Sequence, residues 1–397
     1  MRLRRKELTR DMNLLLIGSA DSIFIRDYCR NILDNPSVKV TILSQKKPQK
    51  YSYDYKELGI AVIEWPRFFQ KGLMKQLLHL VQLKREWKEL GHQIGENDEI
   101  DILHMHFVEP LHLIYFFGLW KKAKKKFLTF WGSDIFEISR TKSFLLSFFL
   151  KQTDNIVFMI LKQKEFFCKI YGHKYDSKIR IIDFGNSQID IIDKVSSKYT
   201  VEKCKEHFKL PLDKYIVHVG YNACKEQQHL AIVKNVANLS QEYLKKMKFV
   251  FHMSYGYSDD YIAYKQQLQE TMYTYRMDYS IIEDYLQGED LAMFRRTCNI
   301  FLYGQKTDAR SASPLEYVYS GAIFICPEWL SENYKLFDEG NIKYYVYNQF
   351  EDLNRVLEQS IRKLEKSEEI ISPFGRKKIQ EKKSWKSLSK EWRSLYE

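Results

Sequence analysis

Short apolar runs alternate with amphipathic stretches along most of the chain. In the first half, helical spacing of apolar residues predicts helices over 23–33 and 73–90 and another beginning at Pro110. Strands that are apolar on both faces are typical of a parallel sheet with helices on each side. The predicted strands of this half are 13–18, 38–44, 59–65, 100–107, 126–132, 155–161 and 178–185.

The same pattern begins again after a polar and charged stretch. Its predicted strands are 214–220, 248–256, 278–285, 298–304, 322–327 and 342–348. We therefore predict an α/β protein with two doubly wound parallel-sheet domains of the Rossmann type. The predicted parts are a first domain at 1–188, a linker at 189–212, a second domain at 213–370, and a helical tail at 371–397 that packs back toward the first domain.

The net charge changes this picture by indicating the kind of partner. Lys and Arg number 63 against 51 Asp and Glu, a formal charge of +12. Such an excess favours nucleic acid, nucleotide phosphates or an acidic membrane surface. The aromatic residues show no RNA-binding pattern of basic and aromatic positions at a defined spacing, so we expect no nucleic-acid partner.

The six cysteines form no C-x-x-C pair and show no metal-ligand spacing with histidine, so we expect reduced thiols and no bound metal. The apolar run before Gly18 is too short for a signal sequence or a membrane span. The apolar stretch at 111–120 is also too short to cross a bilayer. We therefore expect a cytoplasmic protein.

In doubly wound sheets, ligands bind beyond the carboxyl ends of the strands, so the loops there hold the candidate residues. In the first domain, Gly18 and Ser19 follow the first strand and could let backbone amides approach a ligand, although an ordinary tight turn fits equally well. His104 and His106 point to the same side of their strand. His106 is a candidate general base, and His104 is better explained as a packed strand residue. Asp134 is either a helix N-cap or a carboxylate that orients an acceptor hydroxyl.

The second domain offers a candidate anion site. Gly220 ends its first strand, and Lys225 and His229 lie near the next helix start. "DARSASPLEYVYSG" (308–321) predicts another helix start, with Ser313 as N-cap and Glu316 three residues later. Cations beside a helix N-terminus suit a diphosphate. The residues for this role are Lys225, Lys306, Arg310 and Ser313, with Asp308 and Glu316 as acceptors for sugar and ribose hydroxyls.

The two Rossmann-type halves, the lysine after the first strand of the second half and the spaced acidic pair resemble features of the GT-B glycosyltransferases. Retaining families carry a Glu-x7-Glu motif, and Asp308 and Glu316 match its spacing with Asp in the first position. A closer resemblance is to the 4-acetamido-4,6-dideoxygalactose (Fuc4NAc) transferases of glycosyltransferase family 56. The stretches that carry it, in the same order, are "FWGSDIFEIS" (130–139), "VGYNACKEQQHL" (219–230), "HMSYGYSDDYIAYKQQL" (252–268) and "GEDLAMFRRTCNIFLY" (288–303).

The resemblance implies transfer of a sugar from a nucleotide-sugar donor to a lipid-linked saccharide acceptor, without a cofactor or metal. It assigns Trp131, Asp134 and His106 to the acceptor side. The residues it assigns to the nucleotide diphosphate are Gly220, Asn222, Lys225, Arg310, Ser311, Ser313 and Glu316. The acidic pair favours retention of configuration, although a side-chain carboxylate or His106 could serve an inverting displacement.

Membrane contact is a further expectation. The segment 119–127 places five lysines beside an apolar helix, and 143–151 adds an apolar stretch. Both could rest on the anionic inner leaflet of a membrane, although a buried helix followed by a solvated turn is the alternative. Two other functions stay open, namely a non-catalytic GT-B-like partner or glycan-binding subunit and a nucleotide-sugar epimerase.

Overall fold

The computed structural model describes residues 12–34, 37–65, 99–307 and 311–397. The chain folds into two compact units, the first made of residues up to Phe184 together with Leu388–Glu397, and the second of Gly185–Ser387. The predicted helix over 73–90 lies outside the described residues.

The first unit is a parallel sheet of seven strands in the order β3-β2-β1-β4-β5-β6-β7. This order reverses direction between β1 and β4, as in a doubly wound fold, and every predicted strand of this half is confirmed. Its strands are β1 Met12–Ile17, β2 Val38–Ser44, β3 Ala61–Glu64, β4 Ile102–His106, β5 Lys125–Phe130, β6 Asn155–Phe158 and β7 Ile179–Ile181. Its helices are α1 Ile23–Ile32, α2 Ser52–Glu57, α4 Pro110–Tyr115, α5 Phe117–Lys122, α6 Ser133–Phe136, α7 Arg140–Leu150, α8 Leu161–Tyr171 and the 3-10 helix η1 His173–Lys178.

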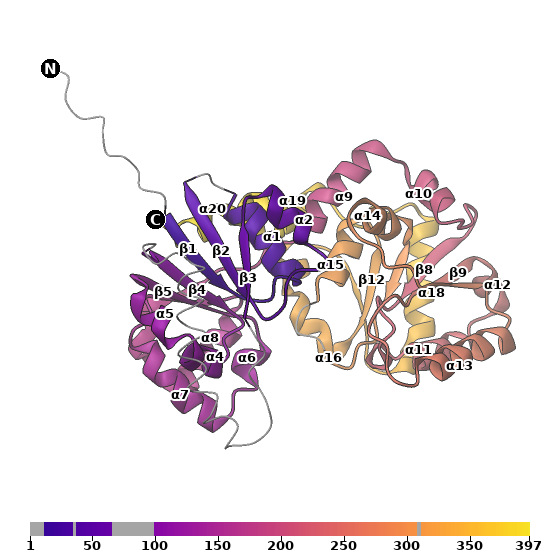
Figure 1. The fold of residues 1–397 in the computed structure, drawn as a ribbon. Helices are drawn as coiled ribbons and strands as arrows, with labels where there is room; N and C mark the ends of the chain where they lie inside the picture. Colours follow the sequence, from indigo (N-terminus) through magenta and orange to yellow (C-terminus); the bar gives the residue numbers. More distant parts are fainter. Residues whose placement is uncertain (1–11, 35–36, 66–98, 308–310) are drawn as a thin grey trace. The chain divides into compact units, whose positions relative to one another are not determined.

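Helices cover both faces of this sheet, as the apolar strands require. Figure 1 shows α1 and α2 on one side of it, and α4, α5, α7 and α8 on the other. The second group packs on alternate strand residues such as Leu103, Met105 and Phe130, together with Trp120 and Phe149 from the helices. Because side chains alternate across a strand, His104 and His106 face the opposite side, under α1.

The last residues of the chain complete the core on the face of the sheet that α1 covers. Trp392 packs edge-on against Tyr28 of α1, with ring centroids 5.0 Å apart, and its indole nitrogen donates to the carbonyl of Asp183 at 2.9 Å. The Tyr396 hydroxyl lies 2.6 Å from the Tyr28 hydroxyl and 2.7 Å from Nδ1 of His104. Residues 388–397 are therefore an integral part of the first core.

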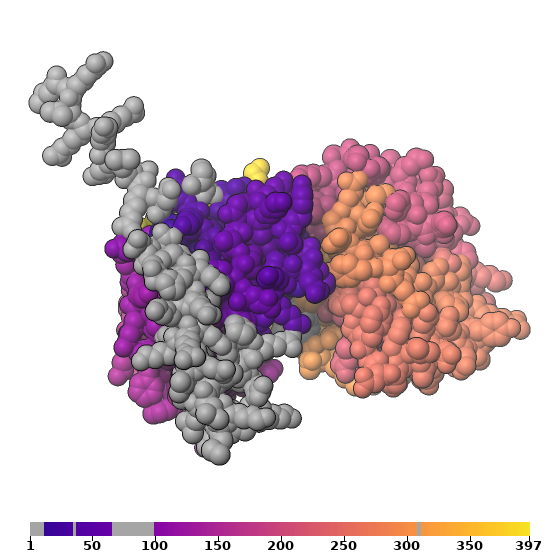
Figure 2. Space-filling view, viewed as in Figure 1, coloured from indigo at the N-terminus to yellow at the C-terminus, as the bar shows by residue number. Residues whose placement is uncertain are grey.

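The second unit is a parallel sheet of six strands in the order β10-β9-β8-β11-β12-β13, and every predicted strand is again confirmed. Its surface is that of one compact body (Figure 2, pink to orange). Its strands are β8 Tyr215–Val219, β9 Met247–His252, β10 Tyr279–Ile282, β11 Ile300–Leu302, β12 Ile323–Pro327 and β13 Tyr345–Tyr347. Its helices are α9 Ser187–Lys198, α10 Val201–His207, η2 Lys225–Gln227, α11 His229–Val236, α12 Gln241–Lys245, α13 Tyr261–Thr274, α14 Gly288–Thr297, α15 Ala312–Tyr319, α16 Glu328–Ser331, η3 Glu332–Tyr334, α17 Lys335–Glu339, η4 Phe350–Asp352, α18 Leu353–Glu365 and α19 Pro373–Lys383. The last helix, α20 Trp385–Arg393, begins in this unit and ends in the first.

The predicted linker at 189–212 differs from the structure. These residues lie within the second unit and contain most of α9 and all of α10. Ile189, Ile192 and Val195 recur at helical spacing and are buried against the side of the sheet that also holds α14 and α15. The polar residues between them are half-buried, such as Asp190 and Asp193, or exposed, such as Lys194, and their number explains why the stretch reads as a linker.

The predicted tail at 371–397 is divided between the two units and does not form a separate part of the chain. Helix α19 packs on the second unit, where Arg376 donates to the carbonyl of Tyr319 at 2.7 Å and Gln380 to the Asp193 carboxylate at 2.8 Å. A Cβ on Gly185 would overlap the Trp385 indole, so this residue must stay glycine for α20 to begin there. The tail therefore belongs to both units, with the change at residues 387 and 388.

We predict that Tyr396→Phe destabilises the first unit. The substitution leaves Nδ1 of buried His104 and the Tyr28 hydroxyl without their hydrogen bonds to residue 396. An unmade buried hydrogen bond costs about 1–3 kcal/mol. Urea unfolding followed by tryptophan fluorescence measures this cost. The control is Tyr273→Phe, at a side chain that is 83% exposed, and an equal loss of stability in both variants would contradict the prediction.

Candidate functional site

The sheet of the second unit reverses its strand order between β8 and β11, and the loops after these two strands form the first candidate site. The loops are tied to each other by three hydrogen bonds. The Gly220 amide donates to the carbonyl of Leu302 at 3.0 Å, and the Lys306 amide donates to the carbonyl of Glu226 at 2.9 Å. The Gln228 side chain donates to the carbonyl of Gly304 at 2.6 Å.

Gly220 has a φ of +65°, which disfavours any other residue. A Cβ here would lie 2.7 Å from Nε2 of His229 and 2.9 Å from Oε1 of Gln227. His229 is fully buried, its Nδ1 lies 3.1 Å from the Tyr264 hydroxyl, and burial lowers its pKa to about 3. The structure therefore corrects the expectation that His229 presents a ligand-binding side chain at the helix start, because its neutral ring instead packs under the Gly220 loop.

Asn222 and Lys225 shape the outer part of the same loop. The Asn222 side chain accepts a hydrogen bond from the Cys224 amide at 3.0 Å, so this mostly buried residue holds the turn. The Lys225 ammonium pairs with the Asp260 carboxylate, and both side chains are largely exposed. Since exposed ion pairs contribute little, a phosphate could replace Asp260 as the partner of Lys225 at small cost.

Helix α15 begins at Ala312 with Ser311 as its N-cap, so the prediction that Ser313 is the N-cap is wrong. The helix can begin ahead of Pro314 because the first-turn amides have no intrahelical partner for proline to remove. The Ser311 hydroxyl lies 3.3 Å from the hydroxyl of Tyr303, just after β11. Lys306 is exposed beside this helix start, whereas Asp308 and Arg310 lie outside the described residues.

Glu316 neither folds back on the Ser313 amide nor reaches solvent. Its Oε2 accepts from Nε of Arg295 at 3.1 Å, and its Oε1 accepts from the Asn186 side chain at 3.2 Å. Arg295 also donates to the Ser313 hydroxyl at 3.0 Å. The predicted capping box is therefore replaced by a buried ion pair, in which the Glu316 side chain is 8% exposed.

Arg295 is the site residue that sequence reasoning missed. It lies on α14, is 3% exposed, and stacks its guanidinium over the Tyr317 ring at 4.1 Å. The pKa of neighbouring His252 is lowered to about 4, mainly because His252 is itself buried and secondly because of the positive charge of Arg295. The sequence "RR" holds no signal that separates Arg295 from Arg296, whose guanidinium contacts Ser196 and Tyr199 instead.

In the first unit, the loops after β1 and β4 lie at the corresponding reversal of strand order. The Gly18 amide donates to the carbonyl of Leu43 at 3.1 Å, and a Cβ on Gly18 would lie 2.9 Å from Cδ1 of Ile25. Ser19 is exposed, and its carbonyl accepts from the Ser22 amide at 3.0 Å. The tight-turn and ligand-loop interpretations are thus compatible at this position.

His106 is placed in the core. Its ring is 1% exposed, 4.3 Å from the ring of His104 and 4.7 Å from that of Tyr28. Both ring nitrogens are buried and have no hydrogen-bond partner among the described residues. Burial lowers the pKa of His106 to about 3, so the ring is a weak base. The structure thus corrects its assignment as an accessible general base, because strand alternation turns residue 106 under α1.

Asp134 links the two loops beside His106. Its carboxylate accepts hydrogen bonds from the amides of Trp131 at 2.9 Å, Gly132 at 2.8 Å and Val108 at 3.0 Å. Burial raises the pKa of Asp134, and these amides oppose that rise. The N-cap of α6 is Gly132, so the prediction that Asp134 is the N-cap is wrong. Asp134 lies in the first turn of α6 and instead holds the preceding loop and the loop after β4 together.

Four aromatic side chains gather at this edge of the first sheet. Trp131 stacks on Phe107 with centroids 5.0 Å apart, and it also contacts Phe24 at 4.8 Å and Phe184 at 4.7 Å. Phe107 has a φ of +56°, a strained conformation for a bulky residue. Such strain occurs where surrounding packing holds a functional loop. Phe24 and Phe107 are each about two-fifths exposed, at 43% and 40%.

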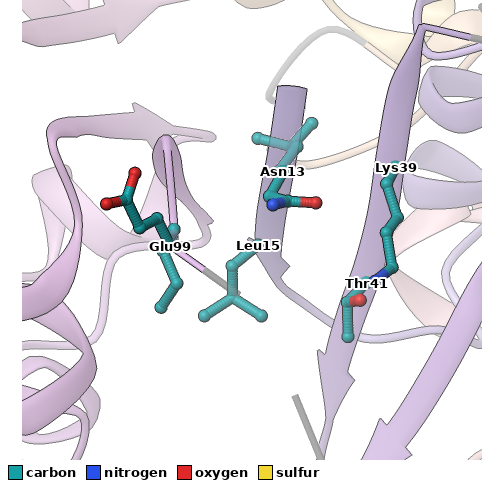
Figure 3. Close-up of a pocket in the computed structure, with 7 residues that line it drawn as sticks. Asn13, Leu15, Lys39, Thr41 and Glu99 are labelled. Atoms are coloured by element: carbon teal, nitrogen blue, oxygen red, sulfur yellow. The ribbon is translucent and has the colours of Figure 1, made fainter. Parts of the chain in front are cut away.

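A separate pocket lies at the other edge of this sheet. Asn13, Lys39 and Glu99 line it at the amino-terminal ends of β1 and β2 and just before β4, as Figure 3 shows. In doubly wound sheets this is the edge away from the ligand-binding loops. We therefore do not include this pocket in the candidate site.

Comparisons with known proteins agree with this architecture. Residues 13–159 match the family model described as "Glycosyl transferase 4-like". No curated protein sequence matches the chain. Among solved structures, a glycosyltransferase from Rickettsia africae aligns with a TM-score of 0.73 at 15% identity, covering 97% of this chain and 98% of that one.

Two further solved structures cover the same share of this chain. HepE from Anabaena, in complex with UDP and glucose, has a TM-score of 0.66 at 10% identity and 99% of its chain covered. Sucrose-phosphate synthase from Thermosynechococcus elongatus has a TM-score of 0.66 at 14% identity and 98% covered. The fold is GT-B, and the family match and these neighbours together support a glycosyltransferase.

We predict that Arg295→Met destabilises the second unit by about 3–5 kcal/mol, since it leaves Glu316 charged and buried without its cation. The double variant Arg295→Met with Glu316→Leu removes both charges and recovers most of the loss. Thermal unfolding of the single and double variants measures the coupling. Additive losses in the double variant would show that the pair is not the source of the effect.

Proposed function

We propose that this protein transfers a sugar from a nucleoside-diphosphate donor to a lipid-linked saccharide or polysaccharide acceptor in cell-surface glycan synthesis. The observation that carries the proposal is the GT-B fold with exposed Lys225 and Lys306 in the loops after β8 and β11. These loops lie where a doubly wound sheet binds its ligand. The finer assignment, a nucleotide-linked 4-acetamido-4,6-dideoxygalactose as donor, rests on the sequence resemblance to family 56.

The donor side supports departure of a diphosphate. As the bond between the anomeric carbon and the phosphate oxygen breaks, the leaving group takes the electron pair and gains negative charge. Lys225, Lys306 and the N-terminus of α15 can stabilise that charge without a metal, and we assign Arg310 the same role from its position in the sequence. A UDP complex of the structural neighbour HepE supports this class of donor.

Gly220 supports the same donor site through its backbone. Its positive φ and the crowding that a side chain would meet keep the β8 loop free for close approach of a phosphate. Ser311 and Ser313 begin α15, and Asn222 holds the turn after Gly220. We assign these residues to shaping the diphosphate site.

Glu316 has a different role in this proposal from the one the Glu-x7-Glu spacing implies. Its carboxylate is committed to Arg295 and Asn186, so it positions the start of α15. We assign the sugar-facing carboxylate to Asp308, which is the other member of the spaced pair.

On the acceptor side, we assign Phe24, Phe107 and Trp131 to binding a sugar ring. Aromatic faces offer a large apolar area at low entropic cost, and these rings lie in the loops where the first sheet can bind a ligand. Asp134 would receive the acceptor hydroxyl near Gly18 and Ser19. Its pKa, raised by burial, suits a group that takes up a proton as the new glycosidic bond forms.

The second candidate function is a non-catalytic partner or glycan-binding subunit. The buried ion pair of Glu316 favours it, because a carboxylate that is held in this way is unavailable to a donor. Hydrolysis of a nucleotide sugar separates the two, since only the enzyme releases nucleoside diphosphate. A nucleotide-sugar epimerase would instead release an epimeric sugar nucleotide without any acceptor.

We predict that UDP, TDP or GDP raises the melting temperature, and that Lys225→Ala weakens the binding of the effective nucleotide by roughly tenfold or more. A charged hydrogen bond to phosphate contributes about 1.5–3 kcal/mol. Isothermal titration measures the change. The control is Lys234→Ala, which removes an exposed charge from the last turn of α11. Equal affinities in the two variants, or no thermal shift with any of the three nucleotides, would contradict the proposal.

The first unit also supports membrane association. Five exposed apolar side chains lie on α4, α5 and α7, of which α4 and α7 pack together. Phe144 is 64% exposed, and the Lys121 ammonium lies 4.4 Å above the Phe117 ring. No helix among the described residues has the length and apolar character to cross a bilayer. We therefore propose peripheral binding to an anionic inner leaflet through this apolar patch, which consists of Leu111, Ile114, Phe117, Phe144 and Phe148.

We predict that replacing Phe144 and Phe148 by Ser lowers binding to vesicles of phosphatidylglycerol and phosphatidylcholine by more than about tenfold. Each Phe contributes roughly 1.5–3 kcal/mol when it leaves water. Vesicle co-sedimentation measures the loss. Ile262→Ser on α13 is the control, because Ile262 is 72% exposed but lies on the second unit. Unchanged binding after the double substitution would remove the patch from the proposal.

A further inference from the structure

We propose that the first unit carries a binding site for a thiophilic divalent cation, with Zn²⁺ as the best match, formed by Cys168, His173 and Asp176. These residues belong to none of the loops described above. Cys168 lies in the last turn of α8, and the other two lie on η1. The proposal concerns a site additional to the sugar-transfer site.

The chain turn between the two helices brings the three side chains together. Gly172, with a φ of +72°, ends α8 and lets η1 begin at His173. The Cys168 sulfur lies 3.5 Å from Oδ1 of Asp176, and Nδ1 of His173 lies 3.1 Å from Oδ2 of the same residue. One ligand atom from each residue falls within 4.8 Å of the other two.

This spacing is close to that of a coordination sphere. Zinc bonds of roughly 2.0–2.3 Å in a tetrahedron place neighbouring ligand atoms about 3.3–3.7 Å apart. Closing the group on an ion therefore requires only small side-chain rotations, which exposed side chains can make. His173 is 80% and Asp176 41% exposed, and Cys168 is half-buried. Three protein ligands leave the fourth position to water.

The ligand chemistry is that of zinc rather than of magnesium or calcium. Thiolate and imidazole are soft and borderline donors, whereas magnesium and calcium take oxygen. Without a metal, the Cys168 thiol donates a hydrogen bond to Oδ1 of Asp176. Metal binding replaces the thiol proton, so one S–H bond breaks, one S–Zn bond forms, and one proton passes to solvent.

Lys164 acts against the cation. It lies one turn before Cys168 on α8, so its positive charge is near the proposed ligands and repels a cation bound there. Removing this charge should strengthen metal binding, whereas a change in an unrelated lysine should not. The opposing charge therefore provides a test that a generally destabilising substitution cannot imitate.

The position of the site in the fold suggests its effect. Helix α8 leads from the carboxyl end of β6 back to the start of β7, so its last turn lies at the edge opposite the candidate sugar site. A bound ion would join α8 to η1 and restrain the entry into β7. We expect it to stabilise the first unit without taking part in sugar transfer.

Cobalt(II) titration of the reduced, tag-free full chain tests the proposal, because a thiolate ligand produces a charge-transfer absorption band that Zn²⁺ then removes. We expect one Co²⁺ per chain, no band in Cys168→Ser, binding weakened by more than about tenfold in His173→Ala, and tighter binding in Lys164→Ala. Zn²⁺ should also raise the melting temperature of the unaltered protein.

Cys224→Ser is the matched control, because Cys224 is also half-buried and its sulfur also contacts a carboxylate, that of Glu226, but it lies in the second unit. It should keep the band. Melting temperatures without metal establish that each variant is folded. A band that survives in Cys168→Ser, the absence of any band, or binding that Lys164→Ala leaves unchanged would overturn the proposal.

Discussion

The constraint on which the rest of the structure depends is that both sheets are parallel throughout. A parallel strand must be followed by a crossover, and its apolar faces must be covered on both sides. In each unit this requirement places helices on both faces, and it places the loops after the strands at one edge. The two loops at each reversal of strand order are where the structure can accept a ligand.

Packing within each unit divides the polar residues near these loops into two kinds. Buried groups such as His106, His229 and Glu316 are neutral or paired, and they support the backbone around the loops. Exposed groups such as Lys225 and Lys306 keep their charge available. The proposed chemistry therefore rests on the exposed cations and on backbone amides, with the buried groups holding them in position.

The buried Arg295–Glu316 ion pair connects several elements of the second unit. It joins α14 to α15, and the hydrogen bond from Asn186 to Glu316 also connects it to the N-cap of α9. It also removes the carboxylate that the acidic spacing assigns to a donor, which is the feature that keeps a non-catalytic function in consideration. Ions in such a pair are costly to bury singly, so the pair must form or be lost as a unit.

By itself the sequence determined the strands, their parallel arrangement and the loops that matter, because apolar periodicity and glycines after strands are local signals. It also predicted the turn at Gly220 after β8 and, to within a few residues, the start of helix α15. Tertiary structure decided which side chains point into the core. Arg295 and Arg296 are neighbours in sequence, and only packing buries the first. Likewise, the helical spacing of Ile189, Ile192 and Val195 is present in the sequence, but only the packed structure shows that these residues are buried in the second unit, because burial depends on contacts with residues distant in the sequence. The folded turn at Gly172 similarly sets the short distance between the side chains of Cys168 and His173.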